Sequence, residues 1–487
     1  MLTGILLIPA LGALVVALLP RRSASFAKWV ALGATAAALA LSGVVVAGYE
    51  FGGGLQFVER YDWIAQLNIE YFLGIDGLSL PILVLSTLLS LLAVVGSWKV
   101  TSRPRFYYAM LLLLAAGMNG VFMALDFVLF YVFWEIVLVP MYFIISQWGG
   151  ERREYAAIKF FLYTFLGSVF MLVGIIALYL QTGTFDMVAL QATTLGAALP
   201  VGFQMWVFLA FFLGFAVKVP MWPLHTWLPD AHVEAPTAAS VLLAGVMLKM
   251  GTYGFLRVSV GVLPDAFHAW QLPLAVLAVI AIIYGAVVAF AQTDMKKLVA
   301  YSSVSHMGFA MLGIASGTAV GLNAAMAVNV AHGLATGMLF FLVGMVYDRA
   351  HTRQIADLSG IANRMPIYTG LFAFAAFASM GVPPLAGFVG EFLAIVGTWT
   401  SAAIPHALVV VGALGVLLGA AYMLWLLQRS LFGPVSEAVE PLTDIGVREI
   451  ATVLPLAALI VAIGVSWSLL LNYTDPFATA LAAAIGG

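Results

Sequence analysis

The chain has 487 residues, of which 63% are hydrophobic and only 9% are charged, whereas soluble domains carry about 25% charged residues. The formal net charge of -2 argues against a nucleic-acid partner, and the absence of cysteine excludes disulfides, thiolate nucleophiles and cysteine-ligated metal centres. This composition predicts an integral membrane protein.

Fourteen apolar segments of the sequence are long enough to cross a hydrocarbon core of roughly 30 Å. Because a backbone in lipid must satisfy its own hydrogen bonds, and the short alternation of a barrel is absent, we expect an all-α protein. The basic residues follow the first segment rather than precede it, so we expect a retained span and not a cleaved signal peptide. The predicted spans are 2–19, 27–49, 79–98, 106–123, 125–147, 155–180, 203–228, 236–257, 269–292, 297–316, 322–346, 366–400, 406–428 and 450–472.

The basic residues predict the orientation of these spans. If the N-terminus lies outside, 16 of the 20 basic residues fall at inside loops or inside helix ends, as the positive-inside rule requires. Only Arg60 and Arg257 fall outside, and the outside loop at 50–78 is acidic, with Asp76 near its end. The 16 inside residues are Arg21, Arg22, Lys28, Lys99, Arg103, Arg105, Arg152, Arg153, Lys159, Lys296, Lys297, Arg349, Arg353, Arg364, Arg429 and Arg448.

Two predicted spans contain prolines in their middle. The seventh reads FFLGFAVKVPMWPLHTWLPDA, and the twelfth reads FASMGVPPLAGFVGEFLAIV. Proline removes a backbone donor, and two interrupted helices five spans apart are typical of inverted repeats with a transport site at the breaks. We therefore expect two inverted five-helix repeats, spans 4–8 and 9–13. The chain then divides into residues 1–105 (three spans), 106–260 (first repeat), 261–430 (second repeat) and 431–487 (last span and a short tail).

Four charged residues lie deep inside apolar segments. Lys218 precedes the first break, Lys249 lies within SVLLAGVMLKMGTYGF, Glu135 lies within LFYVFWEIVLVPMYF, and Glu391 follows the second break. An intramembrane lysine costs at least about 2.5 kcal/mol, so it is expected to face the bundle interior with a partner or water. Glu135 and Lys218 are predicted to form an ion pair. Snorkelling of a lysine to the membrane surface and a static structural pair are the alternatives.

Two histidines complete this set. His306 lies among the hydroxyl groups of KKLVAYSSVSHMGFAML, and His332 lies in mid-span near Asn329. Imidazole titrates near neutral pH, so both are candidates for a proton relay; the alternative is a structural hydrogen bond between helices. His225, His232 and His268 are expected near membrane surfaces, without the spacing of metal ligands, and Asp126 is expected to be a solvated helix cap.

The run KVPMWPLHTWLPDAHVEAPTAASVLLAGVMLKMGTYG resembles the antiporter-like membrane subunits of respiratory complex I and of multisubunit cation/proton antiporters. The segments GIDGLSLPILVLSTL, WEIVLVPMYFII, TDMKKLVAYSSVSHMG and GFVGEF extend this similarity over almost the whole chain. The resemblance implies fourteen helices with two inverted five-helix repeats. It also implies that the proton-handling positions of the family fall on Glu135, Lys218, Lys249, His306, His332 and Glu391.

The resemblance also indicates which member type this is. Subunit M, the chain 4 type, has a glutamate at the second broken helix where its sister subunits have lysine, and this sequence has Glu391. About 15 residues follow the last predicted span, too few for the long lateral helix of the L type. The antiporter-complex subunit of the same type and the cyanobacterial ferredoxin-linked relative are the nearest alternatives.

The expected function is proton translocation in the membrane arm of NADH:quinone oxidoreductase, driven by remote redox chemistry, with no cofactor, no metal and no redox centre in this chain. The expected partners are antiporter-like sister subunits on both sides and the lipid bilayer, with redox subunits reached only indirectly. The alternatives are a cation/proton antiporter subunit, a quinone-binding redox subunit and a passive scaffold. The expected location is an energy-transducing membrane, in a bacterium the inner one.

An even number of spans and the lysine and arginine asymmetry predict that both termini lie outside. Epitope tags placed at either end should bind antibody in right-side-out membrane vesicles and stay protected in inverted vesicles. Tags reached only from the cytoplasmic side would contradict this topology and, with it, the assignment of both breaks.

Overall fold

The computed structural model describes residues 1–196 and 199–486 of the chain. The side chains of residues 21–23 and 192–196 are outside the described part, so the predicted placement of Arg21 and Arg22 lies outside the described residues. The helices are α1 (Leu2–Leu18), α2 (Ala27–Ala47), α3 (Ser79–Gly96), α4 (Pro104–Met123), α5 (Phe127–Trp148), α6 (Arg153–Thr182), α7 (Met187–Gly196), α8 (Val201–Lys218), α9 (Trp227–Glu234), α10 (Thr237–Leu242), α11 (Leu248–Gly254), α12 (Pro264–Phe290), α13 (Met295–Ser316), α14 (Ala319–Ala350), α15 (Pro366–Ser379), α16 (Ala386–Trp399), α17 (His406–Leu431), α18 (Val447–Val465) and α19 (Ser468–Ala484).

The helical membrane architecture expected from the sequence is confirmed. Within the described residues, 12 helical segments are long and apolar enough to cross a membrane. Helix α1 is one residue short of that length, and α15 and α16, with 14 residues each, divide the predicted twelfth span. The exact count of fourteen spans stays a prediction.

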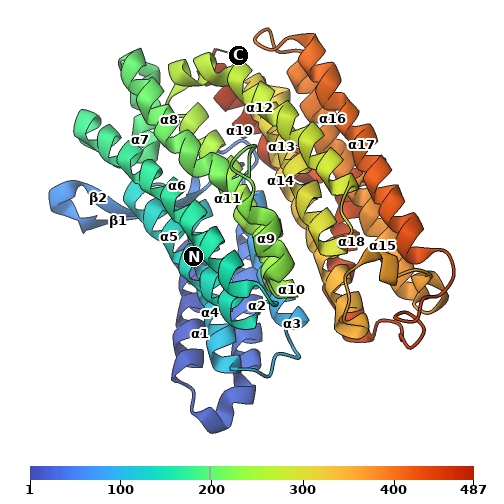
Figure 1. Cartoon of the computed structure of the whole chain (residues 1–487). Helices are drawn as coiled ribbons and strands as arrows, with labels where there is room; N and C mark the ends of the chain where they lie inside the picture. Colours follow the sequence, from blue (N-terminus) through green and yellow to red (C-terminus); the bar gives the residue numbers. More distant parts are fainter. Residues whose placement is uncertain (197–198, 487) are drawn as a thin grey trace.

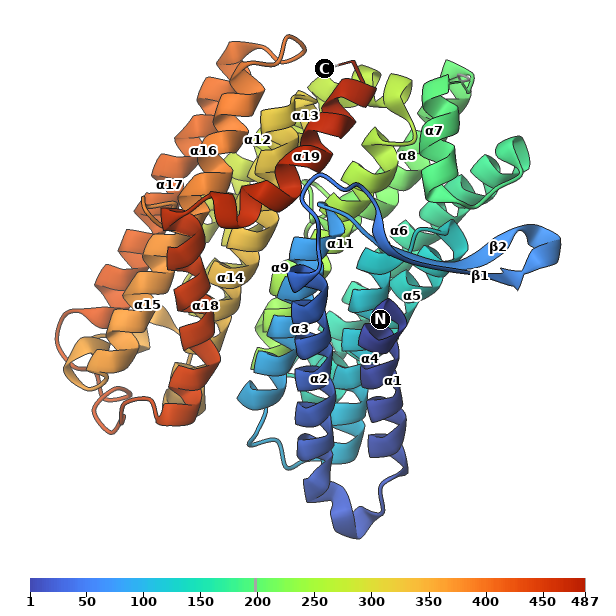
Figure 2. The same cartoon turned by 180° about the vertical axis from the view of Figure 1, so that it is seen from behind.

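Both predicted breaks are present, and the two broken helices run in opposite directions. In Figures 1 and 2, α8 leads downward into α9, whereas α15 leads upward into α16. Breaking a helix frees backbone carbonyls, and the first break satisfies one of them because the indole of Trp227 donates to the carbonyl of Val217 at 2.9 Å. The opposite directions are those of an inverted repeat.

Two aspartates mark corresponding points of the repeats. Asp126 caps the start of α5 by accepting from the amides of Val128 and Leu129, and Asp294 caps α13 by accepting from the amides of Lys296 and Lys297. Asp126 also forms an isolated antiparallel bridge to Asp186, and Asp294 forms one to Gln354. In each repeat the bridge reaches the segment that follows the second helix after the aspartate. Asp126 is a cap as predicted, but it is fully buried rather than solvated.

The predicted outside loop 50–78 is largely a β-hairpin. Strands β1 (Gln56–Ile64) and β2 (Ile69–Ile75) pair antiparallel, and Glu59 of β1 binds the amino group of Met1. We call this side of the molecule the hairpin face. The opposite side, the basic face, carries Lys99, Arg152, Arg349, Arg353 and Arg448.

The predicted short tail is the helix α19, which lies across the hairpin face (Figure 2). The Asp475 carboxylate of α19 accepts a hydrogen bond from the side-chain amide of Asn323 on α14 at 3.1 Å. The carbonyl of Ile485 accepts a hydrogen bond from His268 of α12 at 2.7 Å. Both ends of the described chain therefore lie on the hairpin face.

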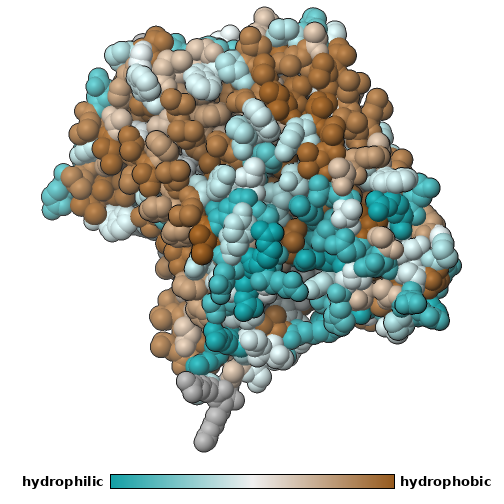
Figure 3. Space-filling model, in the orientation of Figure 1, coloured by the Kyte–Doolittle hydropathy of each residue, from teal (hydrophilic) through white to brown (hydrophobic). Residues whose placement is uncertain are grey.

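Three helical segments are shielded from lipid on all sides. In the most apolar stretch of segment 237–260, and in that of α14, every residue is buried. In the most apolar stretch of α13, 94% of the residues are buried. Outside them, apolar side chains cover the upper helices in Figure 3, whereas hydrophilic residues gather below, where α9 and α10 end. A membrane helix that touches no lipid is free to carry polar groups, because its surroundings are protein.

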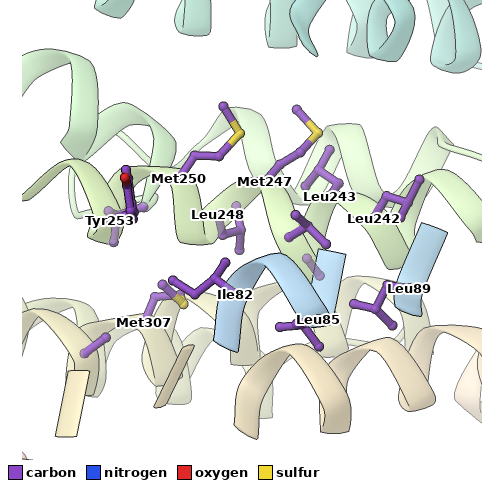
Figure 4. Close-up of a cluster of buried hydrophobic side chains, with 14 of the residues drawn as sticks. Ile82, Leu85, Leu89, Leu242, Leu243, Met247, Leu248, Met250, Tyr253 and Met307 are labelled. Atoms are coloured by element: carbon purple, nitrogen blue, oxygen red, sulfur yellow. The ribbon is translucent and has the colours of Figure 1, made fainter. Parts of the chain in front are cut away.

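The central segment 237–260 packs closely against α3 and α14. Leu85 and Leu89 of α3 pack against it in Figure 4. A Cβ atom at Gly333 of α14 would lie 2.5 Å from the Leu85 side chain and 2.8 Å from the carbonyl oxygen of Gly245. Glycine is therefore required for the close approach of the two helices.

Gly333→Ala is expected to destabilise the protein by about 1–3 kcal/mol, because the added methyl group overlaps backbone of the neighbouring helix. Gly337→Ala is the matched control, since its Cβ would meet its nearest atom, on Leu89, at an ordinary 3.4 Å. Thermal unfolding of the purified complex in detergent, followed by loss of this subunit, measures both. Equal midpoints for the two variants would contradict the close-packing argument.

Candidate functional site

Four of the six predicted site residues form one connected row in the core. Lys249 lies on α11, His332 on α14, His306 on α13 and Glu391 on α16. All four are at most 7% exposed. The three shielded helices thus supply three members of the row, and the second broken helix supplies the fourth.

Lys249 and His332 are in direct contact. The Lys249 ammonium lies 2.6 Å from Nδ1 of His332 and also donates to the carbonyl of Ala244. That carbonyl is available because residues Leu243–Met247 form a π-helical segment, η3, which displaces the regular backbone bonds. A second π-helical segment, η4 (Phe255–Val260), follows α11. The lysine is therefore bound to one fixed acceptor and one titratable acceptor.

His306 and Glu391 form the second contact of the row. Nδ1 of His306 lies 2.7 Å from the Glu391 carboxylate, and the hydroxyls of Ser379 and Tyr422 lie 3.1 and 3.2 Å from Nε2. Ser379 is the last residue of α15, so the helix break brings a hydroxyl to the imidazole. Both ring nitrogens of His306 therefore have polar partners.

A small cavity joins the two contacts. The rings of His306 and His332 are 5.8 Å apart between centroids, and both line a cavity of about 20 Å³ together with Thr336, Ser379 and Glu391. The Thr336 hydroxyl and Nε2 of His332 have no hydrogen-bond partner in the described residues. A space of this size and polarity suits one water molecule, which would connect Lys249–His332 with His306–Glu391.

Glu135 and Lys218 do not form the predicted ion pair. The Lys218 ammonium instead lies over the rings of Trp134 and Phe160, at 5.4 and 5.9 Å from their centroids, and no ion pair in the described residues includes Glu135. The carboxylate is still close enough to act electrostatically on Lys218. Aromatic faces stabilise a buried cation, which explains why the ammonium needs no direct carboxylate contact.

Lys218 lies beside the helix that carries Lys249. A Cβ atom at Gly251 of α11 would lie 2.7 Å from the carbonyl oxygen of Phe215 and 2.9 Å from the amide nitrogen of Val219. The end of α8, with Lys218, is therefore packed directly on α11. The two lysines are thus carried by helices in direct contact.

Several residues near the row are more deeply buried than the sequence indicates. Arg257 and Asp76, expected in outside loops, are buried and form a two-pronged ion pair at 2.6 and 2.8 Å. His225 and His232, expected near membrane surfaces, are 2% and 0% exposed. A signal was present in both cases, since Asp76 lies in the segment GIDGLSL and His232 lies in α9, the short helix directly after the first break.

Comparisons with known proteins show the family of this chain. The family described as NADH:quinone oxidoreductase/Mrp antiporter matches residues 124–419, and the family described as the amino terminus of NADH-ubiquinone oxidoreductase chain 4 matches residues 54–124. NADH-quinone oxidoreductase subunit M of Rhodobacter capsulatus is 45% identical, over 98% of this chain and 95% of its own. NAD(P)H-quinone oxidoreductase chain 4 1 of Microcystis aeruginosa is 40% identical, over 95% of this chain and 89% of its own.

Solved structures share the fold. A chain of respiratory complex I from Thermus thermophilus with bound NADH superposes with a TM-score of 0.90 at 30% identity, and each chain covers 100% of the other. A chain of the Mrp complex from Dietzia has a TM-score of 0.87 at 22% identity, over 100% of this chain and 99% of its own, which shows the fold alone. The chain belongs to the antiporter-like subunit M (chain 4) family of NADH-quinone oxidoreductase, complex I.

Proposed function

We propose that this chain moves protons across the membrane through the row Lys249–His332–His306–Glu391, with Glu135 and Lys218 controlling the charge of Lys249. The observation that carries this proposal is the connected row of four buried titratable side chains in helices shielded from lipid. A scaffold would not need such costly groups. The energy comes from redox chemistry in other subunits, so this chain acts as a translocase without a redox centre of its own.

The row offers a sequence of short proton transfers. A proton on Lys249 passes to Nδ1 of His332, crosses the small cavity and reaches His306, whose other contact is Glu391. Imidazole suits the two middle positions because it accepts and releases protons near neutral pH. Glu391 is the sixth residue of α16, the second half of the broken helix, and the exposed residues 382–384 at the break favour access of water to this end of the helix.

We infer the orientation from the charges. The basic face is assigned to the cytoplasm by the positive-inside rule, and the hairpin face with both described chain ends to the opposite side. In a bacterium this corresponds to the inner membrane with the hairpin in the periplasm. The division into residues 1–105, 106–260, 261–430 and 431–487 is proposed as the functional one, with one broken helix in each of the two middle parts.

Glu135→Gln and Lys218→Ala are each expected to reduce proton pumping strongly, because either change fixes the charge environment of Lys249. Glu135→Asp should retain part of the activity, since the charge survives and only its reach is shortened. Reconstituted complex, with the pH gradient followed by a fluorescent dye and assembly checked on a native gel, measures this. Full pumping by an assembled Glu135→Gln or Lys218→Ala complex would contradict the controlling role.

Glu391→Gln is expected to lower the protons pumped per electron, because His306 loses its ionisable partner. Glu440→Gln is the matched control, since Glu440 is an exposed carboxylate on a loop. Glu391→Lys reverses the charge and is expected to pump poorly beside Lys249 and the two histidines. Normal pumping by an assembled Glu391→Gln variant would show that Glu391 only stabilises the broken helix.

A further inference from the structure

A charged cavity lies on the basic face, away from the row. It has a volume of about 270 Å³ and lies between α3, α4, α10, α14 and α18. Exposed Lys99 and Asp348 line it toward the surface, and Thr237 and Gly344 line it on the side of α10 and α14. At about 30 Å³ for each water molecule, it has room for several. The bulk solvent of the basic face therefore reaches into the helical bundle.

His232 lies between this cavity and the row. Its side chain is fully buried, and neither ring nitrogen has a hydrogen-bond partner in the described residues. Leaving a buried polar group unsatisfied costs about 1–3 kcal/mol, so a structural role alone does not explain a histidine here. The imidazole is stacked on the ring of Phe340 of α14, with centroids 4.5 Å apart and planes 12° apart.

His232 lies close both to the cavity wall and to a helix of the row. Thr237 and Ala238 of α10 line the cavity, and the hydroxyl of Ser240 on the same helix donates to the His232 carbonyl at 3.2 Å. The Lys296 ammonium donates to the carbonyl of Ala235, three residues after His232, at 2.5 Å. The ring stacked on the imidazole belongs to α14, the helix that carries His332. His232 therefore lies between the wall of the cavity and the helix of the row.

Phe340 occupies the same gap on α14. It is eight residues from Asp348 and eight from His332, which is about 12 Å along the helix in each direction. Position 344, one turn toward the cavity, packs on Thr237, since a Cβ atom there would lie 2.3 Å from the Thr237 hydroxyl. Phe340 is thus a large apolar side chain on the buried imidazole, and its chain neighbour Phe341 lines the cavity.

We propose that His232 is the group that takes up protons from the basic-face cavity and passes them to Lys249, and that Phe340 controls this step. With the ring stacked on the imidazole, water from the cavity does not reach the histidine. When the ring turns away, water connects Asp348 and Thr237 to His232, a proton enters, and the ring closes before the proton moves on. The inference rests on the proposed function, because it supplies the row with its protons.

His232→Phe separates this role from a structural one. Phenylalanine keeps the stack on Phe340 and the burial but carries no proton. The variant is expected to lower the protons pumped per electron to the level of Lys249→Ala, and Asp348→Asn to lower the rate of pumping while Asp348→Glu restores it. Asp357→Asn is the matched control, a carboxylate on the same face that binds the Thr352 hydroxyl outside the cavity.

The outcomes distinguish this inference from the proposed function. If Lys249→Ala stops pumping while assembled His232→Phe and Asp348→Asn pump normally, the uptake role of His232 is wrong and the row stands. If assembled Lys249→Ala also pumps normally, both proposals are overturned. Assembly is checked by native gel and by NADH oxidation with an artificial acceptor, which does not need this subunit to move protons.

A labelling experiment tests Phe340 without measuring activity. The chain has no cysteine, so a single introduced cysteine is the only thiol in its peptides. A charged methanethiosulfonate added to the basic face should label Thr237→Cys rapidly and Ser240→Cys slowly, because Ser240 is fully buried on the His232 side, where its hydroxyl bonds to the His232 carbonyl.

Adding Phe340→Ala should increase labelling of Ser240→Cys at least about tenfold, as expected for a barrier opened locally. Phe388→Ala, on α16 and away from the cavity, is the control for a general loosening of the bundle. Mass spectrometry of the peptide that contains residue 240 gives the rate. If Ser240→Cys is labelled equally fast with and without the Phe340→Ala substitution, the proposed role of Phe340 is overturned.

Discussion

The cost of keeping an ammonium group away from water governs the centre of this molecule. Lys249 is fully buried, and its ammonium has two acceptors, the Ala244 carbonyl and the His332 imidazole. The first acceptor requires a π-helical segment and the second requires a neighbouring helix at very short distance. The glycines at 245 and 333 allow that distance, and the surrounding helices exclude lipid. The irregular backbone and the close packing both follow from one buried charge.

The two repeats treat their charges differently. In the second, His306 and Glu391 are linked by a direct hydrogen bond, with two hydroxyls completing the histidine's partners. In the first, the Lys218 ammonium is surrounded by aromatic rings, and Glu135 acts on it without contact. A cation held by ring faces has no fixed hydrogen-bond direction, so it moves more easily than one in a paired bond. The first repeat is suited to a change of charge state and the second to a transfer of protons.

The sequence was sufficient for the helical architecture and for the burial of four of the six candidate site residues in one row, because a buried charge and a mid-span proline are both conspicuous against an apolar background. The roles of all six residues stay a prediction. The sequence did not show which side chains these residues contact. Contacts such as Lys249 with His332 depend on how the helices rotate and how close they approach, which composition and hydropathy do not encode. The ion pair of Glu135 with Lys218 was wrong because opposite charge predicts attraction but not which neighbour, carboxylate or aromatic ring, lies nearer. The hairpin and α19 were missed because short amphipathic segments outside the membrane leave weak patterns.

Helix α19 has a consequence for the order in which the chain is completed. Its Phe477 ring covers the Arg257 guanidinium, at 5.3 Å, and the carbonyl of Tyr473 approaches Gly77, next to Asp76. Arg257 and Asp76 belong to segments that enter the membrane well before α19 is synthesised. Because α19 is the last helix to be synthesised, Phe477 and Tyr473 can cover this ion pair only after the preceding helices have been made. A chaperone or neighbouring subunit that recognised the uncovered pair would bind the unfinished chain and not the finished one.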